Sequence, residues 1–324
     1  EKPFEIAPDP DYLFLSRQHQ NAISSLEFGL MDTAGLILLT GEIGTGKTTI
    51  IRHILGKIDD NFIVGVVFNT NVNANQFLGL VLEEFGIHLQ SEHKAGAIKD
   101  LNHFLVEVHS KNRRPLLIID DAQGLSMEAL EEVRLLSNLQ AGNKMLLQIM
   151  LVGQPELNVK LKVPAMASLC QRIAVNYHLK VFNREETGRY IAHRLETAGG
   201  RSDLFTGAAV TLIHGLTRGT PRSINQLCHA ALVYGFADEI PLIDTPVIEE
   251  IVADTQNTGI GAERWYLDQN VSPTLHGVDG VESQLLSGME SVERQHPRND
   301  VEGRIEELEQ RLGDYTRDLR EALN

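Results

Sequence analysis

The segment of the sequence that most restricts the fold is residues 36–50, LILLTGEIGTGKTTI. It begins with a short apolar run, Leu36 to Leu39, which is typical of a buried strand. The next eight residues, Gly41 to Thr48, match the spacing G-x-x-x-x-G-K-[ST] at every fixed position. Glycines at those positions allow positive φ, so that backbone N–H groups can curl around phosphate oxygens. The helix predicted to begin near Gly46 adds the positive end of its dipole, and the segment therefore predicts a strand–loop–helix cradle for a nucleoside triphosphate.

Side chains of this loop supply the rest of the predicted site. Lys47 can reach the β- and γ-phosphates, and the Thr48 hydroxyl can ligate Mg²⁺. The alternative is a flexible turn that carries a lysine by chance, and the strand and helix on either side argue against it. We therefore expect ATP and Mg²⁺ as ligands. The predicted phosphate-binding residues are Gly41, Glu42, Ile43, Gly44, Thr45, Gly46, Lys47, Thr48 and Thr49.

A second apolar run ends in two acids. In RRPLLIIDDAQGL, the run Leu116 to Ile119 is followed by Asp120 and Asp121. An acid at the carboxyl end of such a strand lies beside the phosphate loop in open α/β sheets. Asp120 is predicted to hold Mg²⁺ through its water shell, and Asp121 to polarise the attacking water. A helix N-cap pair after a strand is the alternative, and the phosphate loop upstream favours the catalytic interpretation.

The remaining periodicity predicts an α/β fold of the P-loop NTPase type. Strands are expected at 62–68, 145–152 and 175–179, and helical patterns lie between the strands at 77–85, 98–108 and 127–136. Alternation of strand and helix with crossovers of this length indicates a parallel sheet with both faces covered. From Asn183 onward, several amphipathic patterns predict a small α-helical domain, which we call the lid.

Charge and apolar content limit the remaining possibilities. A net charge of -15 over 324 residues is unsuited to coating nucleic acid or anionic membrane, although a local basic patch is compatible with it. The two cysteines, Cys170 and Cys228, suit a reducing compartment. The sequence shows neither a secretory signal nor an apolar run of the roughly 18 to 20 residues that crosses a bilayer. We expect a cytoplasmic protein, with peripheral attachment at the inner membrane left open, and the start at Glu1 suggests a trimmed chain.

Beyond these motifs, the chain resembles the AAA+ ATPases, and among them the secretion-type family of general secretion pathway protein A. The resemblance runs from about Glu1 to Asp254. Bacterial transposition ATPases share much of the pattern and are the main alternative. The segments that carry the resemblance are PFEIAPDPDYLFLSRQHQNAISSLEFGL, LLIIDDAQGLSMEALEEVRLLSNLQ, LLQIMLVGQPEL, LCQRIAVNYHL, EETGRYIAHRLETAGG and LFTGAAVTLIHGLTRGTPRSINQLCHAAL.

The resemblance implies roles for three further side chains. Gln154, in GQPEL, takes the sensor 1 position, where an amide can bond the γ-phosphate or the attacking water. Arg172, in QRI, falls where the family carries its arginine finger, which reaches the nucleotide of a neighbouring subunit. Arg222, in GTPRSIN, matches sensor 2, a lid arginine that contacts the γ-phosphate, with Arg218 as a weaker substitute. The alternatives are an ordinary helix N-terminal residue for Gln154 and a surface ion pair for Arg172.

One position departs from the family pattern. The residue after the magnesium aspartate is usually glutamate, whereas here it is Asp121. Because aspartate is one methylene shorter, its carboxylate falls short of the attacking water by on the order of an ångström, and a misplacement of this size can cost about a hundredfold in rate. We therefore expect a working but slow ATPase.

The predicted domains are a nucleotide-binding α/β domain (1–182), the lid (183–255), a flexible linker (256–297) and a short coiled-coil-like helix (298–324). The linker is rich in glycine, serine, asparagine and acid, with a docking patch around Trp265. An amphipathic helix packed on its own domain is the alternative for the last segment. Its heptad seam consists of Val301, Ile305, Leu308, Leu312, Tyr315 and Leu319.

Together these features predict an ATP-hydrolysing switch that oligomerises, as a ring or another assembly, and regulates or assembles a bacterial envelope secretion or polymer-export machinery. Its expected partners are further copies of the chain and envelope proteins bound through the C-terminal tail. A DNA-associated ATPase of the transposition-regulator type is one alternative, and the acidic charge and the lack of a basic arm count against it. A slow-hydrolysing, ATP-bound scaffold is the other, and Asp121 keeps it open.

Overall fold

The computed structural model describes residues 2–5, 12–32, 35–68, 70–88, 94–142 and 144–257. By contacts the chain divides into two units, Glu1–Asp268 and Gln269–Asn324, and every described residue belongs to the first. The linker beyond residue 257, the patch around Trp265 and the heptad helix lie outside the described residues. The bounds of the four predicted domains stay predictions.

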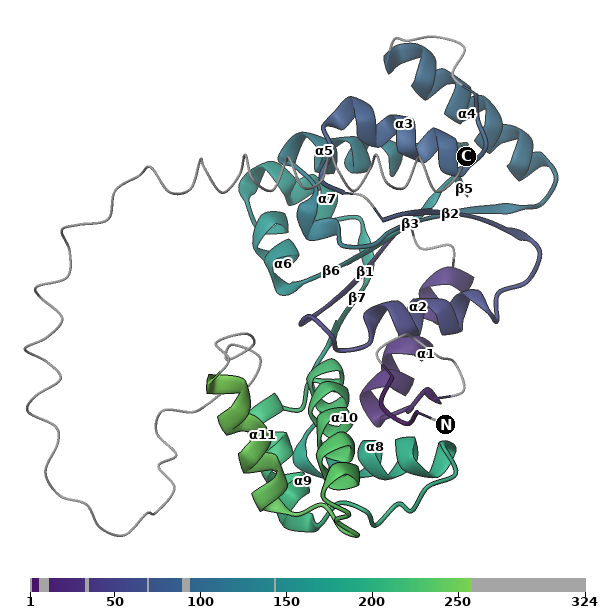
Figure 1. Ribbon diagram of the computed structural model, residues 1–324. Helices are drawn as coiled ribbons and strands as arrows, with labels where there is room; N and C mark the ends of the chain where they lie inside the picture. Colours follow the sequence, from purple (N-terminus) through teal and green to yellow (C-terminus); the bar gives the residue numbers. More distant parts are fainter. Residues whose placement is uncertain are drawn as a thin grey trace, which may run out of the picture. The chain divides into compact units, whose positions relative to one another are not determined.

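A five-stranded parallel sheet forms the centre of the nucleotide-binding part (Figure 1). Its order is β2-β3-β6-β1-β7, so the phosphate-loop strand β1 lies two positions from the acid strand β3, with β6 between them. In a parallel sheet all carboxyl ends lie at one edge, which brings the loops after β1, β3 and β6 together. The strands are β1 (Leu36–Gly41), β2 (Phe62–Val67), β3 (Arg114–Ile119), β6 (Gln148–Gly153) and β7 (Ile173–Leu179).

Both faces of this sheet are buried, as its continuous apolar strands predict. Successive side chains of β1 alternate between two cores: Leu36 and Leu38 pack with α3, α4 and α5 on one face, and Ile37 and Leu39 with α1 and α2 on the other. Figure 1 shows these helices on opposite sides of the sheet. The helices of this part are α1 (Arg17–Met31), α2 (Lys47–Leu55), α3 (Ala74–Glu84), α4 (Lys94–Ser110), α5 (Met127–Leu136), α6 (Pro155–Leu161) and α7 (Ala167–Cys170), with 3₁₀ turns η2 (Ala122–Gly124) and η3 (Pro164–Met166).

The lid is a separate group of helices with its own core. Its first helix begins with a capping box, in which the Asn183 and Glu186 side chains each bond the other's backbone N–H. Cys228 is fully buried in this core, and burial raises the pKa of its thiol far above the usual value. The helices are α8 (Arg184–Thr197), α9 (Gly207–Thr217), α10 (Pro221–Ala237) and α11 (Thr245–Asn257).

The predicted strand 145–152 is wrong at its beginning. The run is broken: β5 (Lys144–Met145) pairs antiparallel with β4 (Gln140–Ala141), and β6 starts only at Gln148. The buried Gln148 amide donates to the carbonyl of Leu30 at the end of α1 (3.3 Å), which holds the start of β6 against that helix. The run 145–152 is apolar at every position except Gln148, so it predicts one continuous strand and carries no sign of such a break.

None of the helices in the described part of the chain combines the length and the apolarity that crossing a bilayer requires.

Candidate nucleotide-binding site

The loop between β1 and α2 has the backbone that the glycine pattern predicts. Gly44 and Gly46 adopt φ values of 78° and 100°, which other residues rarely adopt. Gly46 is the N-cap of α2 and has no side chain with which to cap it, so the first-turn N–H groups of the helix are available to an anion. The Thr45 hydroxyl donates to the Glu42 carbonyl (2.8 Å) and closes the loop on itself.

Lys47 is the buried cation of this loop. Its ammonium donates to the carbonyls of Gly41 (2.8 Å) and Glu42 (3.0 Å) at the base of the loop. Burial lowers the pKa of Lys47, and the carboxylates of Asp120 and Asp121 act against that shift. The two hydrogen bonds keep the ammonium inside the loop that would surround a phosphate group.

A hydroxyl and a carboxylate meet where the sequence predicts the metal ligands. Thr48 Oγ1 donates to Asp120 Oδ2 at 3.1 Å, across the space between α2 and the end of β3. Burial raises the pKa of Asp120, while hydrogen bonds from the Asp121 N–H and from Thr48 act against that rise. These are the oxygen ligands that Mg²⁺ prefers, and the ion is usually bound by one or two carboxylates together with substrate phosphates. The two residues fit a magnesium ion.

Asp121 and Gln154 lie beside this pair, at the ends of β3 and β6. Asp121 is exposed and adopts a left-handed conformation (φ 52°, ψ 37°), which aspartate tolerates better than most residues. Gln154 is the N-cap of α6, directly before Pro155. Both line the same pocket as Lys47, Thr48 and Asp120.

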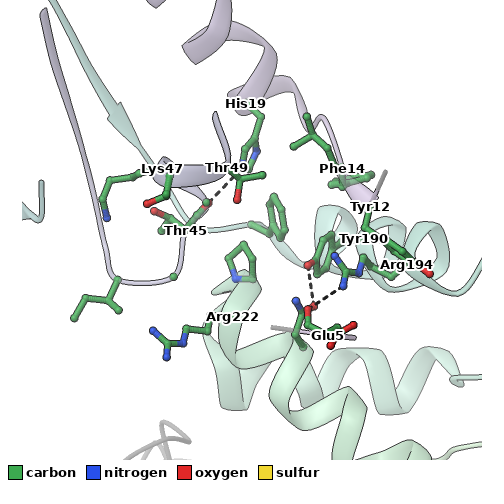
Figure 2. Close-up of a pocket in the computed structure, with 18 of the residues that line it drawn as sticks. Glu5, Tyr12, Phe14, His19, Thr45, Lys47, Thr49, Tyr190, Arg194 and Arg222 are labelled. Atoms are coloured by element: carbon green, nitrogen blue, oxygen red, sulfur yellow. Dashed lines mark hydrogen bonds between the residues drawn. The ribbon is translucent and has the colours of Figure 1, made fainter. Parts of the chain in front are cut away.

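That pocket has a volume of about 490 Å³ and lies between the phosphate loop, the N-terminal segment and the lid (Figure 2). Of the predicted loop residues, Ile43 through Thr49 line it, whereas Gly41 and Glu42 lie at the base of the loop and accept the bonds from Lys47. Figure 2 shows Arg222 near the phosphate loop, and Tyr12, Tyr190 and Arg194 farther along the pocket.

The lid contacts the phosphate loop through its backbone. The Arg222 N–H donates to the Gly44 carbonyl (3.2 Å). A Cβ at Gly44 would come within 2.5 Å of the Arg222 Cβ, so glycine is needed both for the positive φ and for this approach. The predicted sensor 2 residue thus lies in the first turn of α10, directly beside the loop.

Sequence reasoning missed the end of the pocket away from the phosphate loop. The buried Arg194 donates to the carbonyls of Pro3 (2.5 Å) and Glu5 (3.1 Å), and its guanidinium lies 4.5 Å from the centre of the Tyr12 ring. The Tyr190 hydroxyl donates to the Asn225 amide oxygen (2.8 Å). In the sequence, Tyr190 counts only as an apolar position of an amphipathic helix, so periodicity gives no sign of this role.

His19 was also missed. The sequence motifs assign no role to His19, which is buried on α1, where its ring makes hydrogen-bonding contacts with Ser16 Oγ (2.8 Å) and the Thr45 carbonyl (3.3 Å). Burial lowers the pKa of His19. The ring also lies 5.4 Å from that of Phe182, centre to centre, so it contacts both the phosphate loop and the segment that leads to the lid.

The structure does not bring two predicted arginines to this pocket. Arg172 precedes β7, at the amino end of the strand, and donates to the Ser137 carbonyl (3.2 Å). Arg218 is the C-cap of α9 and lines a different groove with Lys180 and His214. Arg218 is therefore not placed to substitute for Arg222.

Comparison with known proteins agrees with the fold and the loop. The family described as "AAA domain" matches residues 30–161. The ORC2 protein of Aeropyrum pernix, solved as ADPNP–ADP complexes, has a TM-score of 0.56 at 18% identity, over 78% of this chain and 71% of that one. Cdc6p of Pyrobaculum aerophilum has a TM-score of 0.57 at 14% identity, over 74% and 67%. The chain thus carries an AAA domain with the fold of the AAA+ P-loop NTPases.

A relative with higher sequence identity indicates which kind of AAA+ protein the chain resembles. The chain is 37% identical, over 239 residues, to General secretion pathway protein A of Aeromonas hydrophila. The match covers 73% of this chain but 44% of that protein, so the chain spans less than half of the relative's length. The predicted resemblance to secretion-type AAA+ ATPases is confirmed.

Proposed function

We propose that the protein binds Mg·ATP in the pocket between phosphate loop and lid and hydrolyses it slowly. The main support for the proposal is that three phosphate- or metal-binding groups lie close together at one edge of the sheet. They are the buried Lys47 ammonium, the hydroxyl–carboxylate pair of Thr48 and Asp120, and the unpaired first turn of α2. Together these are the groups that hold a triphosphate and its metal ion.

Each of these residues has a defined task in hydrolysis. When bound, Mg²⁺ would supply positive charge that offsets the negative charge of the phosphate groups. Thr48 and Asp120 would hold the ion, and Lys47 would turn its ammonium from the loop carbonyls to the phosphate. Asp121 would accept a hydrogen bond from the attacking water, and the Gln154 amide would orient that water or the γ-phosphate.

The lid makes the site responsive to the nucleotide. The backbone N–H of Arg222 bonds the phosphate loop. Arg222 also lines the pocket on the side that the lid forms. Contact between this guanidinium and a γ-phosphate would favour one lid position, and loss of the phosphate would release it. The motion of the lid then reports whether ATP or ADP is bound.

We further infer that the protein acts as an oligomeric switch in envelope secretion or polymer export. The support is the similarity to General secretion pathway protein A, a protein named for its part in secretion. The solved neighbours share the fold at low identity and carry no argument about DNA. The net charge of -15 also favours protein partners over nucleic acid.

The direct test of hydrolysis is phosphate release from ATP, with and without metal. Chelation with EDTA should abolish release, and added Mg²⁺ should restore it. Thr48→Ala should lower kcat by about tenfold or more, because the ion loses a ligand that fixes its position. The matched control is Thr211→Ala, which removes a hydroxyl that bonds only the backbone of an exposed helix turn at Gly207. A Thr48→Ala protein as active as this control would contradict the metal assignment.

A further inference from the structure

Gln123 links the two groups that we assign to the attacking water. It lies in the turn η2, two residues after Asp121. Its side-chain Nε2 donates to Asp121 Oδ1 (3.1 Å), and its Oε1 accepts from the backbone N–H of Gln154 (3.0 Å). One amide therefore joins the end of β3 to the start of α6.

The turn that carries Gln123 is held by other contacts. Lys160 donates to the backbone carbonyls of Gln123 (2.5 Å) and Leu125 (2.9 Å). The Thr70 hydroxyl donates to the Asp121 carbonyl (2.8 Å). None of these bonds uses the Gln123 side chain, so a variant that lacks its amide can still make all of them.

Small residues make room for this arrangement. A Cβ at Gly153 would lie 2.9 Å from Gln123 Oε1, and a Cβ at Gly124 would lie 2.3 Å from Thr70 Oγ1. Contacts below 3 Å are not tolerated without a shift of one partner. Glycines at both positions thus allow the amide and the threonine to reach their partners.

We propose that Gln123 is a positioning residue that orients the Asp121 carboxylate and fixes its place relative to Gln154. The proposal rests on the proposed ATPase function and extends it. An amide donor on Oδ1 limits rotation of the carboxylate and leaves Oδ2 to accept a hydrogen bond from water. Because the same amide accepts from Gln154, the acid and the sensor keep a constant separation while water is held between them.

The competing interpretation is that Gln123 only stabilises a surface turn. Two substitutions, each with a side chain about as long as glutamine, distinguish the positioning role from a purely structural one. Gln123→Met removes both hydrogen bonds. Gln123→Glu keeps an acceptor for the Gln154 N–H but removes the donor to Asp121 and adds a negative charge beside it.

The experiment measures kcat, KM, ATP affinity and Tm for the parent and both variants, with hydrogen exchange of the Gln154 amide followed by NMR. Gln123→Met should lower kcat by about tenfold or more with unchanged KM and ATP affinity, and the Gln154 amide should lose protection. Gln123→Glu should lower kcat at least as far while that amide stays protected. The control is Gln20→Met, since the Gln20 side chain, on the exposed side of α1, bonds the carbonyl of Leu15 just before that helix.

The outcomes separate this inference from the proposed function. The positioning role is overturned if the parent hydrolyses ATP and both variants keep the parent kcat, whether or not their Tm falls. If the parent binds ATP but never hydrolyses it, the proposed function is overturned instead. The exchange data then still decide the linkage: protection lost in Gln123→Met and kept in Gln123→Glu supports it, and equal exchange in all three proteins contradicts it.

Discussion

At Asp121, the backbone conformation and the distance to the attacking water favour side chains of different length. Its left-handed backbone (φ 52°) favours a short polar side chain, because aspartate adopts this region more readily than longer residues do. Reach toward the attacking water favours glutamate, the usual residue at this position in the family that the chain resembles. The structure gives the aspartate a hydrogen bond from Gln123, which holds the shorter carboxylate in place.

Substitutions of Asp121 test which of the two effects determines the rate of hydrolysis. Asp121→Asn should abolish turnover and keep ATP binding, because the proposed metal ligands are Thr48 and Asp120. Asp121→Glu should raise kcat above the parent, since a misplacement of about 1 Å can cost about a hundredfold in rate. The left-handed backbone disfavours a longer side chain by at most about 1–2 kcal/mol, and this lowers stability rather than kcat. Single-turnover hydrolysis on the three proteins measures this, and a glutamate variant slower than the parent would show that the site is built around the shorter acid.

At the scale of elements, the motif-bearing parts were predictable and the contacts between distant segments were not. β1, the phosphate loop and β3 follow from local apolar runs and from glycine spacing, which depend on few neighbours. The break between Met145 and Gln148 depends on a buried amide that bonds α1, far away in the sequence. The contacts of Arg194 with Pro3 and Glu5 likewise join residues 191 and 189 positions apart, which no local pattern can indicate.

The junction between α10 and the phosphate loop gives an element-scale prediction. Arg222→Ala should weaken ATP binding by about tenfold to a hundredfold, because a hydrogen bond to a charged group contributes about 1.5–3 kcal/mol. The lid should stay in place, since the bond from the Arg222 N–H to Gly44 does not use the side chain. Arg218→Ala, in the groove beside Lys180, is the control and should bind ATP like the parent. Titration calorimetry decides, and equal affinities for the two variants would remove Arg222 from the site.

At the scale of the whole molecule, the predicted finger role of Arg172 requires assembly. It lies at the amino end of β7, while Leu179 at the other end pairs with Gly41 of the phosphate loop. A strand of this length spans roughly 20 Å, which is beyond the reach of an arginine side chain. A catalytic Arg172 must therefore act on the site of another subunit.

A mixing experiment tests action in trans. Arg172→Ala and Lys47→Ala proteins should each be inactive alone. Mixed together, they should regain part of the parent turnover, because some interfaces then combine an intact phosphate loop with an intact arginine. Co-assembly is verified by cross-linking, and a mixture that co-assembles but stays as inactive as its components would count against the finger role.

The account depends above all on the claim that Lys47 and its loop bind the phosphates of ATP. Titration calorimetry of Mg·ATP into the parent, Lys47→Ala and Lys57→Ala proteins tests this most directly. Lys57 is the matched control, because it follows α2 and its ammonium lies 3.9 Å from the Glu27 carboxylate, with its side chain 56% exposed. We predict that Lys47→Ala keeps its fold and loses most of its ATP affinity, while Lys57→Ala binds like the parent. A folded Lys47→Ala protein with the parent's affinity for ATP would contradict the account.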